Sequence, residues 1–195
     1  MKKICYLFIP VVAIVITTVF SCGRSAGGNK QIEIIRASNN SLIKKGAYLV
    51  MISGCNDCHS PKRMDPRGPE IDTLSMLSGY QAQRPIPDFP EELIKTGAVV
   101  VNNDLTAAMG PWGTSFAANL TSDETGIGNW TEEQFKNALT HGWFKGLKNT
   151  RPIMPPMPWQ NFKNMKDEDI KAIFAYLKST KPVKNIVPAF IPAKI

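Results

Sequence analysis

Cys55-Asn56-Asp57-Cys58-His59 forms a C-x-x-C-H motif. This pattern is the attachment signature of c-type haem, in which two cysteine thioethers fix the porphyrin and the adjacent histidine ligates the iron. Two sulfurs three residues apart, on roughly one turn of helix, can reach two vinyl carbons on one edge of the macrocycle. The sequence therefore predicts one covalently bound haem c, with Cys55 and Cys58 as attachment residues and His59 as an axial ligand.

Three other interpretations of the motif compete with haem attachment. A structural zinc site needs four ligands, and once Cys5 is removed with a signal segment and Cys22 carries a lipid, only the distant His141 remains beside the motif. A thioredoxin-like dithiol belongs at a strand-to-helix turn in a βαβ pattern, which is not evident here. A disulfide across two intervening residues would be strained. Haem c is favoured because an exported chain reaches the compartment where such haems are attached.

A low-spin electron-transfer haem needs a sixth ligand, for which a methionine or the second histidine is available. The best candidate is Met157, in the run Pro155-Pro156-Met157-Pro158. Proline on both sides fixes the local backbone, so the thioether can be presented rigidly without a regular element. Met154 is the second candidate, and Met109, His141 or an open position are the remaining alternatives.

Composition places the chain among ordinary globular proteins. Its 195 residues are 43% hydrophobic and 20% charged, which excludes disordered, collagen-like and polytopic membrane classes. The length suggests about one domain, and 15 prolines with 14 glycines favour long loops. The formal net charge is +7, but no run of like charges reaches five, so no nucleic-acid partner is expected. A diffuse basic field suits steering toward acidic redox partners or anionic lipid.

The first 21 residues are predicted to be a signal peptide of the lipoprotein type. Met1-Lys2-Lys3 is a basic start, and the apolar run from Ile4 to Phe20 is short for a membrane span. Val19-Phe20-Ser21-Cys22-Gly23 resembles a bacterial lipobox, although a bulky residue stands where a small one is commoner. Cleavage would leave Cys22 as a lipid-modified first residue. We therefore expect a membrane-anchored lipoprotein that faces the periplasm of a bacterial envelope, with an uncleaved anchor as the alternative.

Three amphipathic segments predict helices. The first covers residues 41–53 and leads directly into the C-x-x-C-H motif. The second covers residues 131–140 and opens with capping-box spacing, and the third covers residues 167–177 with acidic residues in its first turn. Alternating strand patterns are nearly absent outside residues 98–101. We therefore expect a mainly α fold with long loops.

These segments divide the chain into four parts. After the signal peptide at 1–21, residues 22–40 are expected to form a lipid-anchored tether, either as a flexible chain or as an extended segment lying on the domain. The folded domain is placed at 41–183. Residues 184–195 are expected to be a C-terminal tail.

The ordered set of motifs resembles the single-haem class I cytochrome c domains of bacterial periplasmic proteins, especially those related to cytochrome subunits of membrane-bound alcohol and aldehyde dehydrogenases. The resemblance covers roughly residues 44–183. Beyond C-x-x-C-H it rests on Lys45-Gly46-Ala47-Tyr48-Leu49, the segment 119–131, Pro155-Pro156-Met157-Pro158-Trp159 and the ending Ala175-Tyr176-Leu177. It implies the class I cytochrome c fold around one haem, and it favours Met157 over Met154 as the axial ligand.

The resemblance also implies that the first and last helices cross, with Gly46 allowing a close approach and Phe174 or Leu177 packing at the contact. Trp130 and Trp159 flank the matching segments and are expected to pack against the haem. Two departures are evident. Several dehydrogenase subunits of this group carry three haem domains whereas this chain has one motif, and residues 60–118 match no motif of the family.

The leading functional hypothesis is a membrane-tethered periplasmic electron carrier that performs no bond chemistry itself. Its partners would be redox proteins, such as a dehydrogenase or a terminal oxidase or reductase. The alternatives are an electron-accepting cytochrome subunit held in a dehydrogenase complex and, less favoured, a haem peroxidase or sensor with an open sixth position. No nucleophilic triad, phosphate loop or paired-carboxylate site supports a hydrolase or transferase.

The lipobox generates a testable prediction. Cys22→Ser removes the only thiol that the lipid could modify at this position, so the variant should move from the membrane fraction to the soluble fraction. Fractionation with immunoblotting measures this, and mass spectrometry of the mature N-terminus identifies the modification. A variant that stays in the membrane would indicate an uncleaved anchor at residues 4–20.

Overall fold

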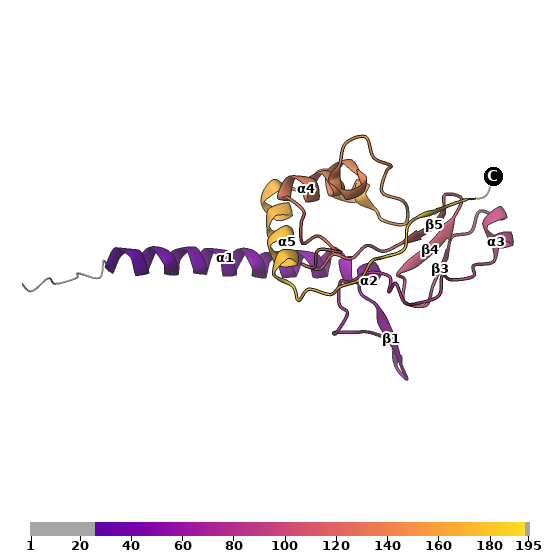
Figure 1. The fold of residues 1–195 in the computed structure, drawn as a ribbon, viewed down its shortest axis with the longest axis horizontal. Helices are drawn as coiled ribbons and strands as arrows, with labels where there is room; N and C mark the ends of the chain where they lie inside the picture. Colours follow the sequence, from indigo (N-terminus) through magenta and orange to yellow (C-terminus); the bar gives the residue numbers. More distant parts are fainter. Residues whose placement is uncertain (1–25, 194–195) are drawn as a thin grey trace, which may run out of the picture.

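The computed structural model describes residues 26–193, and the predicted signal segment and Cys22 lie outside this range. Figure 1 shows a long helix that projects from a smaller body of helices, loops and short strands. The elements in chain order are α1 (Ala26–Ile52), α2 (Cys55–His59), β1 (Lys62–Asp65), β2 (Gly68–Ile71), α3 (Glu91–Lys95), β3 (Val100–Val101), β4 (Ala107–Gly110), β5 (Gly113–Phe116), α4 (Glu132–His141), the 3-10 turns η1 (Phe144–Gly146) and η2 (Trp159–Phe162), α5 (Asp167–Ser179) and β6 (Ile191–Pro192).

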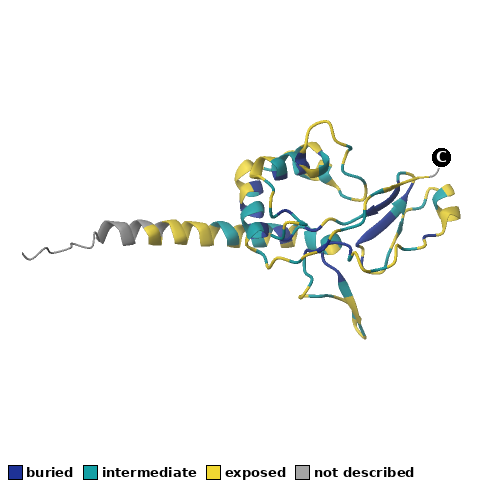
Figure 2. Cartoon of the chain, in the orientation of Figure 1, coloured by how far each residue is buried: buried dark blue, intermediate teal, exposed yellow. Residues whose placement is uncertain are grey.

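Helix α1 is longer than the sequence pattern indicated. It begins at Ala26, so residues 26–40 are helical and form neither the flexible chain nor the extended segment that was expected. Once a first helical turn exists, each further residue adds one hydrogen bond. The helical turns of α1 that pack on the body can therefore nucleate the helix, which then extends toward the N-terminus. Figure 2 shows the projecting part as exposed wherever its burial is described. Within residues 26–193, no helix combines the length and apolarity needed to cross a bilayer.

Helices α1 and α5 cross at Gly46, as predicted. A Cβ atom on Gly46 would overlap the carbonyl oxygen of Ala172 and lie 2.8 Å from the Cβ of Tyr176. Leu177 is buried in the same cluster as Val50 of α1. Phe174 packs, partly buried, against the same cluster, and its ring lies 5.4 Å from that of Phe135 in α4. The absence of a side chain at Gly46 therefore sets how closely the two helices approach.

Helix α4 begins with the capping box that was predicted for it and ends at a glycine. The Thr131 hydroxyl accepts a hydrogen bond from the Gln134 backbone N–H, and the Gln134 side chain accepts one from the Thr131 N–H. Gly142 closes the helix in the left-handed region at φ 66°. Phe135 and Ala138 are the buried residues of α4, so its apolar face packs toward the cluster between α1 and α5.

Residues 60–118 contain most of the strands, and the expectation of a mainly α fold missed them. β1 and β2 form an antiparallel hairpin, and a second sheet has the order β3-β4-β5-β6. Only residues 98–101 carried a strand signal, which corresponds to β3. The other strands are two to four residues long, and β4 and β5 are rich in Gly, Ala, Ser and Thr, so they show no alternation of apolar and polar residues. Tyr80, Phe89 and Ala107 form a second apolar cluster beside this sheet.

The segment that was expected to be a C-terminal tail is part of the domain up to residue 193. Asn185 is buried, and its side-chain N–H groups donate to the carbonyl oxygens of Ser78 at 2.7 Å and Tyr80 at 2.9 Å. Its side-chain oxygen accepts from the Ala82 N–H at 2.9 Å. Farther along, β6 pairs with β5. The sequence pattern hides this role because the attachment uses the hydrogen bonds of Asn185, the pairing of β6 and a single apolar contact of Val187 with the second cluster, and not a periodic apolar stripe.

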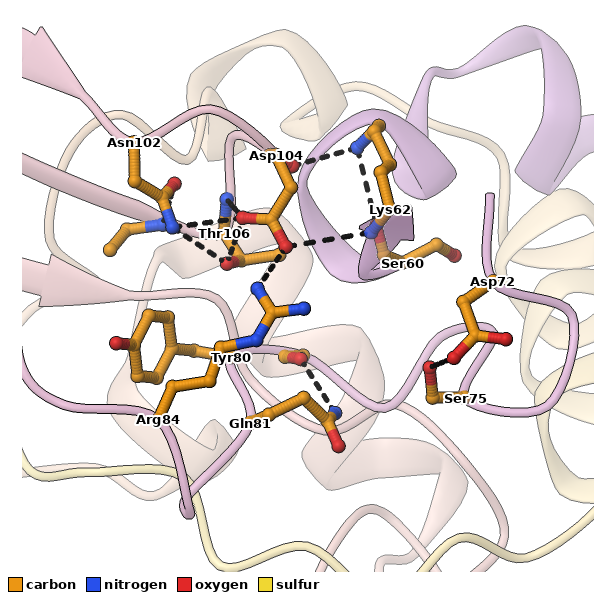
Figure 3. Close-up of polar contacts among 12 residues, drawn as sticks. Ser60, Lys62, Asp72, Ser75, Tyr80, Gln81, Arg84, Asn102, Asp104 and Thr106 are labelled. Atoms are coloured by element: carbon orange, nitrogen blue, oxygen red, sulfur yellow. Dashed lines mark hydrogen bonds and ion pairs between the residues drawn. The ribbon is translucent and has the colours of Figure 1, made fainter. Parts of the chain in front are cut away.

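Asp104 connects the strand-rich segment to the end of α2 (Figure 3). Its side chain is 6% exposed, and one carboxylate oxygen pairs with Arg84. The other oxygen accepts from the Thr106 hydroxyl at 2.6 Å and the Asn102 amide at 2.8 Å. Its backbone carbonyl accepts from the Lys62 ammonium at 2.8 Å. Burial alone would raise the pKa of Asp104, but the hydrogen bond from Thr106 and the charge of Arg84 outweigh it and hold the pKa below its ordinary value.

The helix crossing predicts a large effect of a single methyl group. Gly46→Ala should lower the free energy of unfolding by about 2 kcal/mol or more, because the added Cβ forces α1 away from α5 and this outweighs the better helix propensity of alanine. Lys44→Ala, at an exposed position two residues earlier, should change it by less than about 0.5 kcal/mol. Chemical denaturation of both variants measures the difference. Equal free energies of unfolding for the wild type and Gly46→Ala would contradict the close contact between α1 and α5.

The Asp104 cluster predicts a pH dependence. An aspartate in the unfolded chain titrates near about pH 3.9, and folding lowers the pKa of Asp104 further. Its stabilisation is therefore complete above about pH 4 and is lost as the pH falls through the folded pKa. At pH 7, Asp104→Asn should lower the free energy of unfolding by about 1–3 kcal/mol.

This difference between wild type and Asp104→Asn should shrink below about pH 4. Urea unfolding at several pH values measures it, with Asp88→Asn as a control at an exposed carboxylate. A difference that stays constant down to about pH 2 would show that Asp104 acts through packing and not through its charge.

Candidate functional site

Helix α2 carries all three residues of the C-x-x-C-H motif and directly follows α1. Gly54 joins the two helices in the left-handed region at φ 68°, which favours glycine. A Cβ here would also approach the Asp57 carboxylate to 2.9 Å. The turn therefore redirects the chain after α1 and starts a separate five-residue helix, Cys55–His59, at the position where α1 is fixed against α5.

His59 is oriented by a single hydrogen bond. Its Nδ1 lies 2.8 Å from the carbonyl oxygen of Ala118. Because a carbonyl can only accept, Nδ1 carries the proton and Nε2 keeps a free lone pair, which is the tautomer that ligates a metal. Burial lowers the pKa of His59, and the hydrogen bond to Ala118 acts in the opposite direction. The net effect favours the neutral imidazole that metal binding requires.

Cys55 and Cys58 are free, half-buried thiols. Burial raises the pKa of Cys55 to about 11. Burial also raises the pKa of Cys58, against the positive charge of Lys62, which lowers it. Both thiols are therefore protonated at neutral pH in the chain without haem. Such thiols are unlike the low-pKa cysteines of redox-active dithiols.

The competing interpretations of the motif find no support in this geometry. The two thiols are unpaired, which contradicts the disulfide. α2 follows a helix and not a strand, so the setting differs from that of a thioredoxin-like dithiol. Across residues 26–193, no three His, Cys, Asp or Glu side chains gather as a metal-binding group, so His141 does not complete a zinc site with the motif.

The segment that carries Met157 is held from two sides. Ile153 donates its backbone N–H to the Gly142 carbonyl at 2.7 Å, which ties the start of the segment to the end of α4. Ser115, on β5, donates its hydroxyl to the Pro155 carbonyl at 2.5 Å. Met157 is half-buried, and its own carbonyl accepts from the Trp159 N–H at 2.9 Å as η2 begins.

One short stretch of chain, residues 115–118, contacts both candidate ligand segments. Ser115 holds Pro155, two residues before Met157, and Ala118 holds the ring of His59. Three residues of extended chain span at most about 11 Å, so the Cα atoms of Ser115 and Ala118 are that close or closer. The sequence pattern gave no signal for this stretch, because the Ala118 contact uses a backbone carbonyl and Ser115 lies in the unmatched segment.

The remaining candidate residues occupy different surroundings. Trp130 packs, partly buried, against the cluster that Cys55 also contacts. The indole of Trp159 covers Gly142, where a Cβ atom would overlap its ring. His141 is exposed and stacks on Trp143 with ring centres 4.6 Å apart. Met109 packs against the second cluster, beside Tyr80 and Phe89.

Comparisons with known proteins point to one family. A family model for cytochrome c matches residues 43–181. A nicotinate dehydrogenase subunit of Pseudomonas putida is 39% identical over 80 residues, which cover 40% of this chain and 6% of that protein. The gluconate 2-dehydrogenase cytochrome c subunit of Pantoea cypripedii is 29% identical over 140 residues, which cover 71% of this chain and 23% of that protein.

The fructose dehydrogenase cytochrome subunit of Gluconobacter japonicus is 28% identical over 179 residues, which cover 90% of this chain and 29% of that protein. The chain therefore spans less than a third of the length of each of these three relatives. The family match starts at residue 43 and so includes the C-x-x-C-H motif.

Proposed function

Because this chain belongs to the cytochrome c family, we propose that it carries single electrons through one haem c whose iron is ligated by His59 and Met157. Membership of the family implies covalently bound haem c, and Cys55, Cys58 and His59 supply its C-x-x-C-H motif. The observation that carries the proposal is the hydrogen bond from His59 Nδ1 to Ala118, which leaves Nε2 free to bind iron.

The residues of the site fit the group that the family implies. Two free thiols stand three residues apart on α2, and the ligating histidine follows directly. When bound, haem c supplies an iron that alternates between ferric and ferrous by gaining or losing one electron. The chain itself makes or breaks no bond in this exchange. Its residues orient the imidazole of His59 through Ala118 and hold the segment of Met157 through Ser115.

Ligation by Met157 is supported by the way its segment is held. Ser115 fixes Pro155, and the same stretch of chain reaches Ala118 and thereby His59. Flanking prolines restrict the backbone of Met157 further. Met154 lies in the same segment and is the alternative ligand. The surroundings of His141 and Met109 favour them less, because one is exposed beside Trp143 and the other packs in the second cluster.

We propose a periplasmic location with anchoring through a lipid on Cys22. The helical part of α1 that projects beyond the body would then serve as a stiff spacer, at about 1.5 Å per residue. The electron donor would be a dehydrogenase and the acceptor an oxidase or reductase, both reached by weak, charge-steered contacts. This arrangement suits a tethered carrier.

A stable place in a dehydrogenase complex is the second candidate. It is supported by two relatives that are named as cytochrome subunits of gluconate and fructose dehydrogenases. Because the chain spans less than a third of either, the contacts that hold those subunits in their complexes need not be present here. Size-exclusion chromatography of the protein from its native membrane distinguishes a free carrier from a bound subunit.

The axial ligand is tested with two methionine variants. In haem-loaded protein, Met157→Ala should abolish the weak near-infrared absorption of ferric iron bound to a thioether, and Met154→Ala should keep it. All forms should retain haem after extraction with acidified organic solvent, since both thioethers are intact. The reverse pattern would move the ligand to Met154, and haem lost from the wild type would contradict covalent attachment.

A further inference from the structure

Lys62 holds a positive charge against the end of the motif helix. Its ammonium donates to the carbonyl oxygens of Asp57 at 2.5 Å, Ser60 at 3.2 Å and Asp104 at 2.8 Å. An ammonium has three N–H donors, so all of them are used on backbone acceptors. A flexible lysine side chain is thereby fixed in one place (Figure 3).

No carboxylate neutralises this charge directly. Among the residues that the structure describes, Lys62 forms no ion pair within 4 Å, because its contact with Asp104 is to the backbone oxygen. The carboxylate of Asp104 is paired with Arg84, so these two charges compensate each other. The Asp57 carboxylate is nearby on α2 but exposed, and solvent screens it. The charge of Lys62 is therefore not cancelled by a carboxylate in direct contact with it.

The position of this charge follows from its acceptors. Asp57 lies between Cys55 and Cys58, and Ser60 directly follows His59. Five helical residues span about 7.5 Å, so the ammonium is within roughly 10 Å of the groups that would hold the haem.

We propose that Lys62 raises the reduction potential of the haem by acting as a fixed positive charge, an inference that rests on the proposed function. Reduction removes one unit of positive charge from the iron centre, so a nearby cation favours the reduced state. A unit charge about 10 Å away, at an effective dielectric constant between about 20 and 80, changes the ratio of the two states by about twofold to fifteenfold. The strand-rich segment supports this role by supplying the Asp104 carbonyl.

The test compares charge-removing and charge-keeping variants of the full, haem-loaded chain. Lys62→Met and Lys62→Gln remove the charge, and the glutamine keeps a donor for the carbonyls. At a fixed solution potential, both should raise the ferric-to-ferrous ratio by about twofold to fifteenfold. Lys62→Arg should stay within about twofold of the wild type. Lys95→Met removes an exposed charge at the last residue of α3, a helix that lies apart from α2 in Figure 1, and should leave the ratio unchanged.

The ratio is read from visible spectra in a spectroelectrochemical cell, and the near-infrared absorption checks that the axial ligands are unchanged. An unchanged ratio in either neutral variant with intact ligation would overturn the proposal. A change of the ferric-to-ferrous ratio in Lys62→Arg as large as that in Lys62→Gln would also overturn the proposal, because packing and not charge would then be responsible. A wild-type protein without covalent haem would instead contradict the proposed function, so the two failures are distinguishable.

Discussion

The contact between α1 and α5 at Gly46 determines where the rest of the site can be. With only a hydrogen atom at this position, the α1 backbone reaches the Ala172 carbonyl, and the main apolar cluster forms around the crossing. α2 begins three residues after α1 ends and inherits its position from that crossing. The ring of His59 is then oriented by the carbonyl of Ala118, 59 residues farther along the chain. A contact between two helices thus fixes one side of a site to which neither helix contributes a ligand.

The parts of the fold that follow from local signals were predictable. The C-x-x-C-H spacing, the capping box at Thr131 and the apolar stripe of α5 each depend on residues a few positions apart. The resemblance added the crossing at Gly46. Local signals did not predict the pairing of β5 with β6 or the hydrogen bond from Asn185 to Ser78. Both depend on partners far away in sequence. Likewise, the sequence around Ala118 carries no signal that its backbone carbonyl accepts a hydrogen bond from His59.

The unmatched segment 60–118 serves the site through polar contacts. Asp104, nearly buried, gathers Arg84, Asn102 and Thr106 around its carboxylate and offers its carbonyl to Lys62. Within residues 26–193, no buried side-chain nitrogen or oxygen lacks a hydrogen-bond partner. A fully satisfied buried network of this kind holds a single arrangement, since any alternative leaves a polar group unpaired. The segment is therefore rigid where it meets α2 despite its short strands and small apolar cluster.

The hydrogen bonds that the Asn185 side chain makes with the backbone of Ser78, Tyr80 and Ala82 also bear on the order in which the molecule folds. They join positions more than one hundred residues apart. Closing so long a loop costs conformational entropy before the contact returns any stability, so such contacts tend to form late. The crossing of α1 and α5 spans a similar separation, whereas α2 and its thiols form from neighbouring residues. As the chain emerges from its N-terminus, all residues of α2, with Cys55 and Cys58, are therefore present long before Asn185 can make these contacts.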